Sequence, residues 1–261
     1  MHILLTNDDG INAKGLQSLA LACRNAGFEV TIVAPSHERS AASHSLTLRK
    51  SIRVNKIASH EFSVDGTPVD CMIIALQKLI EKPVDLIISG INAGQNMGED
   101  IHYSGTVAAA KEAAFFGHKA IAISINSYKD QLFETASHWM VQLLQLGIAD
   151  TLHNSHVLNI NIPNIPYNDV RGIRLTHTGH RKYYNFLKLV EEDEHGFSYI
   201  IGGDQPVWEN QKGTDAEAVT DNFISLTPIG FEMTKGDAFP VLMNWIEDNE
   251  SKFKNDYSGD R

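Results

Sequence analysis

HILLTNDDG, residues 2–10, joins a short apolar run to two adjacent acids and a glycine. An uninterrupted apolar run is typical of a parallel strand that is buried on both faces. Ligands of such sheets bind beyond the carboxyl ends of the strands, which is where Asp8 and Asp9 stand. The alternative is the Asp-Gly turn of a β-hairpin, but a helical pattern follows instead of a partner strand. The stretch therefore predicts the first strand of a mostly parallel sheet.

Two adjacent carboxylates at the end of a buried strand repel each other and lose solvation unless a cation compensates them. A divalent metal ion is the simplest compensation, and hard oxygen ligands suit Mg²⁺ or Mn²⁺ better than zinc. Successive side chains at a strand end point in different directions. One carboxylate of Asp8 and Asp9 can therefore bind the ion directly, while the other binds through water or orients a nucleophile.

The composition indicates one large α/β domain, with room for a smaller appendage. The chain has 261 residues, of which 43% are hydrophobic, and a formal net charge of -10. This charge disfavours duplex nucleic acid and anionic membranes as partners. No run approaches the roughly 20 apolar residues of a membrane span, and no signal peptide is apparent. Cys23 and Cys71 lie in apolar helical patterns, which predict buried thiols. We expect a soluble cytoplasmic protein.

Apolar runs and amphipathic segments alternate through the first half of the chain, which implies a mostly parallel sheet with helices on both faces. The periodicity predicts strands at 3–6, 30–34, 84–89, 120–125 and 157–162, and helices at 13–27, 68–81, 104–117 and 129–147. A short hairpin over 52–56 and 61–65 precedes the second of these helices.

The pattern changes after Pro163, where short β-like runs at 173–178 and 197–201 alternate with charged and Gly-rich stretches. We therefore expect a catalytic domain over 1–163, to which a strand at 223–228 returns. Residues 164–261 then form a β arm and a C-terminal region that ends in a helix over 238–248.

A serine-rich loop, residues 36–45, follows the second strand and should reach the same edge of the sheet as the acids. It carries Ser40, Ser43 and Arg39, and hydroxyl and guanidinium groups hold phosphate or complete an oxygen-ligand shell. His37 and His44 are candidate acid–base groups. An ordinary polar loop is the alternative interpretation.

A glycine- and asparagine-rich loop, residues 88–98, follows the third strand of the parallel series. Its glycines permit close backbone approach. Asn92 and Asn96 offer amide oxygens to a metal and amide nitrogens to a phosphate, although a turn without a ligand is equally consistent. The loop lacks the G-x-G-x-x-G pattern, which disfavours a nicotinamide site.

Ser104, Gly105 and Thr106 open a helix of small residues. The free N–H groups of a helix start, with hydroxyls beside them, form an anion site. N-capping by Ser104 explains the same residues, and both roles can hold together. Four such loops at alternate positions of one sheet can converge on one cleft, and this convergence is stronger evidence than any single motif.

With these motifs in place, the chain resembles the SurE family of metal-dependent survival-protein nucleotidases over nearly its whole length. The resemblance rests on ILLTNDDG at 3–10, VAPSHERSAASHSLTL at 33–48, DGTPVDC at 65–71, DLIISGINAGQNMG at 85–98, YSGTVAAA at 103–110, NINIP at 159–163, GTDAEAV at 213–219 and ISLTP at 224–228. It implies a Rossmann-like three-layer fold, followed by an oligomerisation region with a β arm and a swapped helix.

The resemblance also implies hydrolysis of nucleoside monophosphates, 5′ and for some members 3′ esters, with short polyphosphate as a further substrate. One divalent ion per subunit, Mg²⁺ or Mn²⁺, is expected. The implied metal ligands are Asp8, Asp9, Ser40 and Asn92, and the implied phosphate and substrate contacts are Asn96, Ser104, Gly105, Thr106 and Ser43. A homodimer by C-terminal exchange is expected, and the exchanged arm can also build a tetramer. Some relatives place a histidine near the segment that is Glu232–Gly236 here, which has none.

Our sequence-based hypothesis is attack by a metal-activated water on phosphorus, with Asp8 or Asp9 orienting that water or accepting its proton. A nucleotide or phosphate sensor without turnover is the rival from another class. A nicotinamide oxidoreductase and a purely structural role explain fewer of the motifs.

Overall fold

The computed structural model describes residues 1–184, 187–202, 207–209 and 211–255. It divides into two compact units, residues 1–230 and residues 231–261. The first unit holds a nine-stranded sheet in the order β3-β4-β2-β1-β5-β6-β7-β13-β8. Its strands are β1 (His2–Thr6), β2 (Glu29–Pro35), β3 (Val54–Ala58), β4 (Glu61–Val64), β5 (Leu86–Ala93), β6 (Ala120–Ile125), β7 (His156–Ile162), β8 (Ile173–Leu175) and β13 (Ile224–Gly230).

The central strands β4, β2, β1, β5, β6 and β7 are parallel to one another. Antiparallel pairing occurs where β3 joins β4 and where β13 joins β7. The residues of β1 and β6 are buried throughout, as expected for parallel strands covered on both faces. The predicted mostly parallel α/β fold is confirmed.

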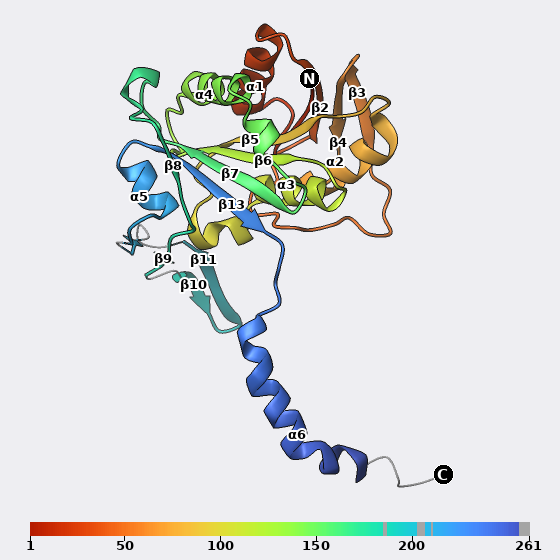
Figure 1. The fold of residues 1–261 in the computed structure, drawn as a ribbon, viewed down its shortest axis with the longest axis vertical. Helices are drawn as coiled ribbons and strands as arrows, with labels where there is room; N and C mark the ends of the chain where they lie inside the picture. Colours follow the sequence, from red (N-terminus) through yellow and green to blue (C-terminus); the bar gives the residue numbers. More distant parts are fainter. Residues whose placement is uncertain (185–186, 203–206, 210, 256–261) are drawn as a thin grey trace. The chain divides into compact units, whose positions relative to one another are not determined.

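Helices cover both faces of this sheet (Figure 1). The helix α1 (Lys14–Asn25) packs with α4 (Phe133–Gln145) on one face, and α2 (Pro68–Ile74) packs with α3 (Gly105–Phe115) on the other. Thr67 begins α2 with a capping box, in which its side chain accepts from Asp70 N–H and the Asp70 carboxylate accepts from Thr67 N–H. Three-layer packing of this kind leaves the strand ends, rather than the sheet faces, open to a ligand.

The predicted helix over 68–81 differs in detail from the structure. After Ile74 the α-helix continues as a π-helical turn over Ala75–Leu79, and it ends there. Strand β5 is also longer than the predicted 84–89, because it runs on to Ala93 after a register shift opposite β6. The extension carries the glycine- and asparagine-rich loop out from the edge of the sheet.

The expected domain boundary after residue 163 also differs from the division in the structure. Strands β8 and β13 both join the main sheet, so the first unit extends to Gly230. The region after residue 163 adds β9 (Arg181–Lys182) paired with β12 (Val207–Trp208), the hairpin β10 (Leu187–Asp193) and β11 (Gly196–Ile201), and the short helix α5 (Asp215–Thr220). Of these, the sequence analysis predicted only the run that forms β11.

The second unit contains the helix α6 (Phe239–Asn255), which confirms and extends the predicted helix over 238–248. Many of its large apolar side chains are exposed. They are Phe239, Val241, Leu242, Met243, Trp245 and Ile246. Across the described part of the chain, no helix is long and apolar enough to cross a membrane.

Helix α1 approaches the sheet closely at Gly15. A Cβ at this position would lie 2.1 Å from the carbonyl oxygen of Ile91 and 2.8 Å from Cε1 of Phe133. Because the first of these neighbours is backbone, it cannot rotate out of the way.

We expect Gly15→Ala to lower the free energy of unfolding by about 1–3 kcal/mol through overpacking, despite the better helix propensity of alanine. Urea unfolding measures the change. Gly230→Ala is the control, since a Cβ there meets nothing within 4 Å. An unchanged unfolding free energy in Gly15→Ala would show that the helix packs more loosely than this contact requires.

Candidate metal and phosphate site

The candidate site lies where the strand order reverses. From β1 the chain crosses to β2 on one side, and after β4 it returns to β5 on the other side of β1. The loops that follow β1 and β5 therefore diverge and leave a crevice at the carboxyl ends, which is the usual ligand position in open α/β sheets. The acids, the serine-rich loop, the glycine- and asparagine-rich loop and the start of α3 all reach this edge.

The acidic turn after β1 is fixed by its own side chain and by its neighbours. The side chain of Asn7 accepts from the N–H of Gly10 at 3.2 Å and donates to the Gly10 carbonyl at 2.9 Å. Gly10 has φ +100°, and a Cβ there would meet the backbone of His37 at 3.2 Å. Glycine thus lets the serine-rich loop cross directly over the acidic turn.

Asp8 is buried against the start of α3. Its carboxylate accepts hydrogen bonds from the hydroxyl of Thr106 and from the N–H groups of Gly105 and Thr106. A Cβ on Gly105 would lie 2.8 Å from the Cβ of Asp8, so glycine is required for this approach. The helix N-terminus that the sequence analysis assigned to a phosphate therefore already faces a carboxylate, as its dipole favours.

Asp9 is tied to the last residue of β5, since its Oδ2 accepts from the N–H of Ala93 at 3.1 Å. Burial is the main cause that raises its pKa, to about 6, and the negative charges of Asp8 and Glu38 raise it further. Burial likewise raises the pKa of Asp8, although the hydrogen bonds from the start of α3 oppose this. Both carboxylates are thus held where their charged forms are unfavourable.

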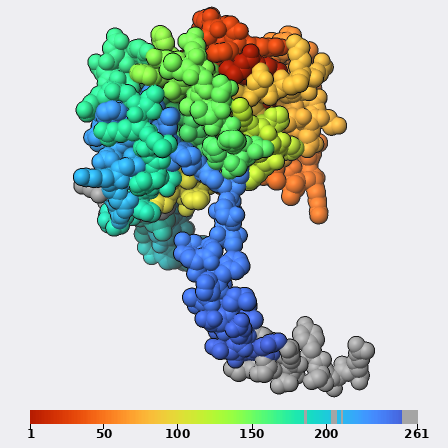
Figure 2. Space-filling view, in the orientation of Figure 1, coloured from red at the N-terminus to blue at the C-terminus, as the bar shows by residue number. Residues whose placement is uncertain are grey.

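The serine-rich loop is anchored to this turn, because the N–H of Arg39 donates to the carbonyl of Asp8 at 2.7 Å. The hydroxyl of Ser40 donates to Glu38 at 2.5 Å. The hydroxyl of Ser43 donates instead to the carbonyl of His102 at 2.7 Å. The exposed Ser40 side chain thus contacts Glu38, whereas Ser43 fastens the loop to the segment before α3. Figure 2 shows the orange atoms that follow this loop standing out from one side of the first unit.

The amides of the glycine- and asparagine-rich loop are both engaged through nitrogen. Nδ2 of Asn92 donates to the carbonyl of Gly94 at 2.7 Å, which leaves its amide oxygen as the group for a cation. Nδ2 of buried Asn96 donates to Ser124 at 2.8 Å. A carboxamide nitrogen has two protons, so Asn96 retains one donor for a phosphate oxygen.

Two further asparagines hold this loop in place. Asn161 accepts from the N–H of Asn96 at 2.9 Å, and the Nδ2 groups of Asn159 and Asn161 donate to its carbonyl at 2.8 and 3.0 Å. Both residues lie in the NINIP motif at 159–163, and the sequence alone predicted no role for either. Two polar side chains in a fully buried strand were the available signal, since buried polar groups require partners.

Asp215 anchors the far end of the same loop. Its carboxylate is fully buried and accepts from the N–H groups of Gly98 at 3.0 Å, Gly179 at 2.8 Å and Ala216 at 2.8 Å. Buried carboxylates need such compensation. This acid was also quoted without a role, and it links the glycine- and asparagine-rich loop to the chain that leads into β9.

The two candidate histidines have other partners. Nδ1 of His37 lies 2.9 Å from the hydroxyl of Ser36, and His37 is exposed. Nε2 of His44 lies 2.7 Å from Glu112, and its ring stacks on Phe115. Their described contacts are therefore with side chains other than Asp8 and Asp9.

The donor set fits a hard divalent cation. In the described part of the chain, no group of three or more His, Cys, Asp and Glu side chains is arranged so that it could hold a metal ion. A centre here would consist of two carboxylates completed by hydroxyl and amide oxygens, which are the ligands that Mg²⁺ and Mn²⁺ prefer. The side-chain charges that act on Asp9 are negative, so an added cation would relieve them.

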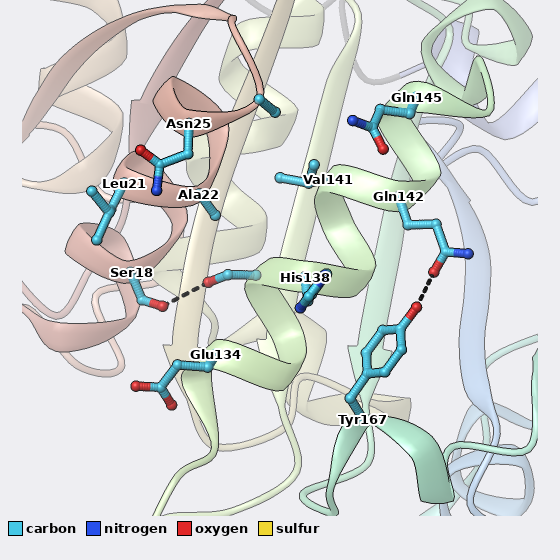
Figure 3. Close-up of a pocket in the computed structure, with 12 residues that line it drawn as sticks. Ser18, Leu21, Ala22, Asn25, Glu134, His138, Val141, Gln142, Gln145 and Tyr167 are labelled. Atoms are coloured by element: carbon cyan, nitrogen blue, oxygen red, sulfur yellow. Dashed lines mark hydrogen bonds between the residues drawn. The ribbon is translucent and has the colours of Figure 1, made fainter.

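A separate cavity of about 640 Å³ lies between α1 and α4. Figure 3 shows it lined by polar side chains of both helices, with a hydrogen bond between Tyr167 and Gln142. A second bond joins Ser18 of α1 to Ser137 of α4 at 2.8 Å. None of the candidate site residues lines this cavity, so it is distinct from the site at the strand ends.

Known proteins similar to this chain share one family name. The family model "Survival protein SurE" matches residues 3–185. A "5'-nucleotidase SurE" from Stenotrophomonas maltophilia (strain K279a) is 40% identical over 249 residues, which cover 94% of this chain and 96% of the relative. One with the same name from Carboxydothermus hydrogenoformans is 40% identical over 256 residues, covering 95% and 97%. The crystal structure of the Sure protein from Aquifex aeolicus matches with a TM-score of 0.82 and 31% identity, covering 94% and 99%.

The raised pKa of Asp9 has a consequence for the metal-free protein. Its pKa is about 6 in the folded chain against an ordinary value of 3.8. The Asp9 carboxyl therefore binds its proton more tightly in the folded state than in the unfolded state. As a result, the free energy of unfolding falls as the pH rises from about 4 to about 6.

At pH 7.5 and with chelator present, we expect Asp9→Asn to raise Tm by about 2–4 °C for each kcal/mol of repulsion that it removes. Added Mn²⁺ should raise the Tm of the wild type and leave that of the variant nearly unchanged. Differential scanning fluorimetry measures both, with the exposed Asp150→Asn as control. A variant that is less stable than the wild type without metal would contradict the account.

Proposed function

The chain belongs to the SurE family, and we propose that it is a 5′-nucleotidase, a phosphoric monoester hydrolase that acts on nucleoside monophosphates. The observation that carries this proposal is the pair of adjacent acids, buried Asp8 and half-buried Asp9, at the strand-order reversal of the sheet. Adjacent carboxylates would repel a phosphate unless a cation lay between them. Hydrolysis of a phosphate ester at this site therefore requires a cation beside the two acids.

Dependence on a divalent metal is general for this family. For this chain we propose one ion per subunit, Mg²⁺ or Mn²⁺, held by Asp8, Asp9, Ser40 and Asn92. The support is the set of contacts that joins their loops. Arg39 N–H holds the carbonyl of Asp8, and Ala93 N–H holds the carboxylate of Asp9. When bound, the ion would lower the pKa of a coordinated water and neutralise charge on the phosphoryl oxygens.

The phosphoryl group would lie between these acids and the loops beside them. Asn96 would donate its remaining amide proton, and the Ser104 hydroxyl would donate while its oxygen still accepts from Val107 N–H. The start of α3, with Gly105 and Thr106, adds the positive field of a helix N-terminus. We also keep Ser43 as a substrate-binding residue, because its hydroxyl holds the serine-rich loop against the segment before α3.

In the proposed reaction a water oxygen attacks phosphorus, the bond from phosphorus to the ester oxygen breaks, and the nucleoside leaves with a proton on its new hydroxyl. Asp8 or Asp9 orients the water and accepts its proton. Positioning of the phosphoryl group by the surrounding donors supplies much of the acceleration.

Phosphate release from a panel of 5′- and 3′-nucleoside monophosphates and tripolyphosphate tests the proposal, with excess chelator and then with Mn²⁺ or Mg²⁺. We expect release with metal only. Asp8→Asn and Asp9→Asn should each reduce kcat by at least about 10²-fold while folding normally, as for loss of a charge-stabilising group. Ser40→Ala should cost more activity than Ser43→Ala.

The control is Asp150→Asn, an exposed acid outside the site. Folded protein that releases no phosphate under any metal, yet binds a nucleotide in a metal-dependent way, would instead indicate a sensor. Near-normal turnover in either aspartate variant would remove that residue from the site.

We further propose that the subunits form a homodimer by exchange of the C-terminal region, with a tetramer as the larger assembly. The exposed apolar side chains of α6 support this, because an apolar surface of that extent marks an interaction site. We also propose a cytoplasmic location. Cys23 and Cys71 are free thiols, as is usual in reducing compartments.

Leu242 and Ile246 are four residues apart and share one side of α6. We expect the double variant Leu242→Glu/Ile246→Glu to shift the assembly toward monomer, because two charges would have to be buried in the interface. Sedimentation velocity measures the shift. Asn244→Glu adds one charge between these positions and is the control. A double variant that sediments like the wild type would place the dimer contact elsewhere.

A further inference from the structure

The ring of Tyr128 lies against the glycine- and asparagine-rich loop. A Cβ on Gly94 would stand 2.2 Å from Cε1 of Tyr128 and 2.8 Å from two further ring atoms. Gly94 also has φ +111°, which disfavours other residues. Only glycine at this position lets the tyrosine ring contact the loop so closely.

This ring is next to the proposed metal site. Gly94 accepts from Nδ2 of Asn92 through its carbonyl, and the residue before it, Ala93, donates to Asp9. Adjacent Cα atoms are about 3.8 Å apart. The ring thus rests one residue beyond the backbone group that holds a catalytic carboxylate.

The loop that carries Tyr128 is pinned at both ends. After β6, the N–H of Asn126 donates to the carbonyl of Ile162 at 2.9 Å. Further on, Asn164 accepts from the N–H of Leu132 at 2.8 Å and donates to the carbonyl of Asp130 at 3.2 Å. A large aromatic side chain on such a loop is held in position before any ligand arrives, which lowers the entropy cost of binding.

Tyr128 nonetheless remains 65% exposed. One part of its ring is covered by Gly94, and the rest faces solvent.

We propose that Tyr128 is the platform on which the nucleobase of the substrate stacks. This inference rests on the proposed function and specifies which part of the substrate is recognised. A ribose separates the phosphate from the base, so a base must contact the wall slightly beyond the phosphate site, which is where Tyr128 lies. An aromatic ring can stack on any nucleobase, because each base has a π-face. A nucleotidase with this platform would therefore act on several nucleotides and favour the larger purines.

The test compares AMP with ribose 5-phosphate, which has the same ester and no base. We expect Tyr128→Ala to reduce kcat/KM for AMP by on the order of tenfold, mainly through KM, as for loss of one base–aromatic stack. The loss for a pyrimidine nucleotide should be smaller, and kcat/KM for ribose 5-phosphate should stay unchanged. Tyr128→Phe should restore AMP turnover, whereas Tyr128→Leu, which keeps bulk against Gly94, should not.

Equal losses on AMP and ribose 5-phosphate would show that Tyr128 only supports the loop, and this would overturn the proposal. Unchanged AMP kinetics in Tyr128→Ala would also overturn it. A wild type that hydrolyses neither ester would count against the proposed function alone. Calorimetric titration with AMP then decides the stacking question, since weaker binding by Tyr128→Ala supports the platform and equal binding rejects it.

Discussion

The repulsion between two adjacent carboxylates, one buried and one half-buried, is the constraint on which the rest of the site depends. Asp8 and Asp9 follow a strand whose residues are all buried, and burial raises the pKa of both. Their desolvation is offset in part by the start of α3 and by the N–H of Ala93. These hydrogen bonds do not neutralise the negative charge of the two carboxylates in the crevice. A divalent cation balances it, and the same cation allows a phosphate to enter.

The surrounding fold keeps the loops of the site in place from outside. Asn159 and Asn161 hold the backbone of Asn96 from β7, and Asp215 holds Gly98 from the start of α5. The loops are thereby preorganised, and positioning of this kind is how phosphoryl transfer is accelerated. Asp215, which lies after residue 163, thus contributes to the site by holding Gly98.

Much of this arrangement could be predicted from local sequence. Parallel strands with buried residues on both faces give continuous apolar runs, so β6 was predicted with the bounds that it has. The capping box at Thr67 and the cap at Ser104 were equally local. The contacts that required the tertiary structure were those between distant segments. Asp215 contacts Gly98, which is 117 residues away in the sequence, and spacing along the chain does not predict that contact.

The anion at the start of α3 is the clearest example of a contact that the sequence could not predict. The motif at 103–106 predicts an anion site, and the anion that the structure places there is the carboxylate of Asp8. The most direct test of the account is anomalous diffraction from crystals grown with Mn²⁺. We predict one strong peak per subunit, within coordination distance of carboxylate oxygens of Asp8 and Asp9. A strong peak elsewhere with none at these acids, in a preparation that hydrolyses nucleotides, would contradict it.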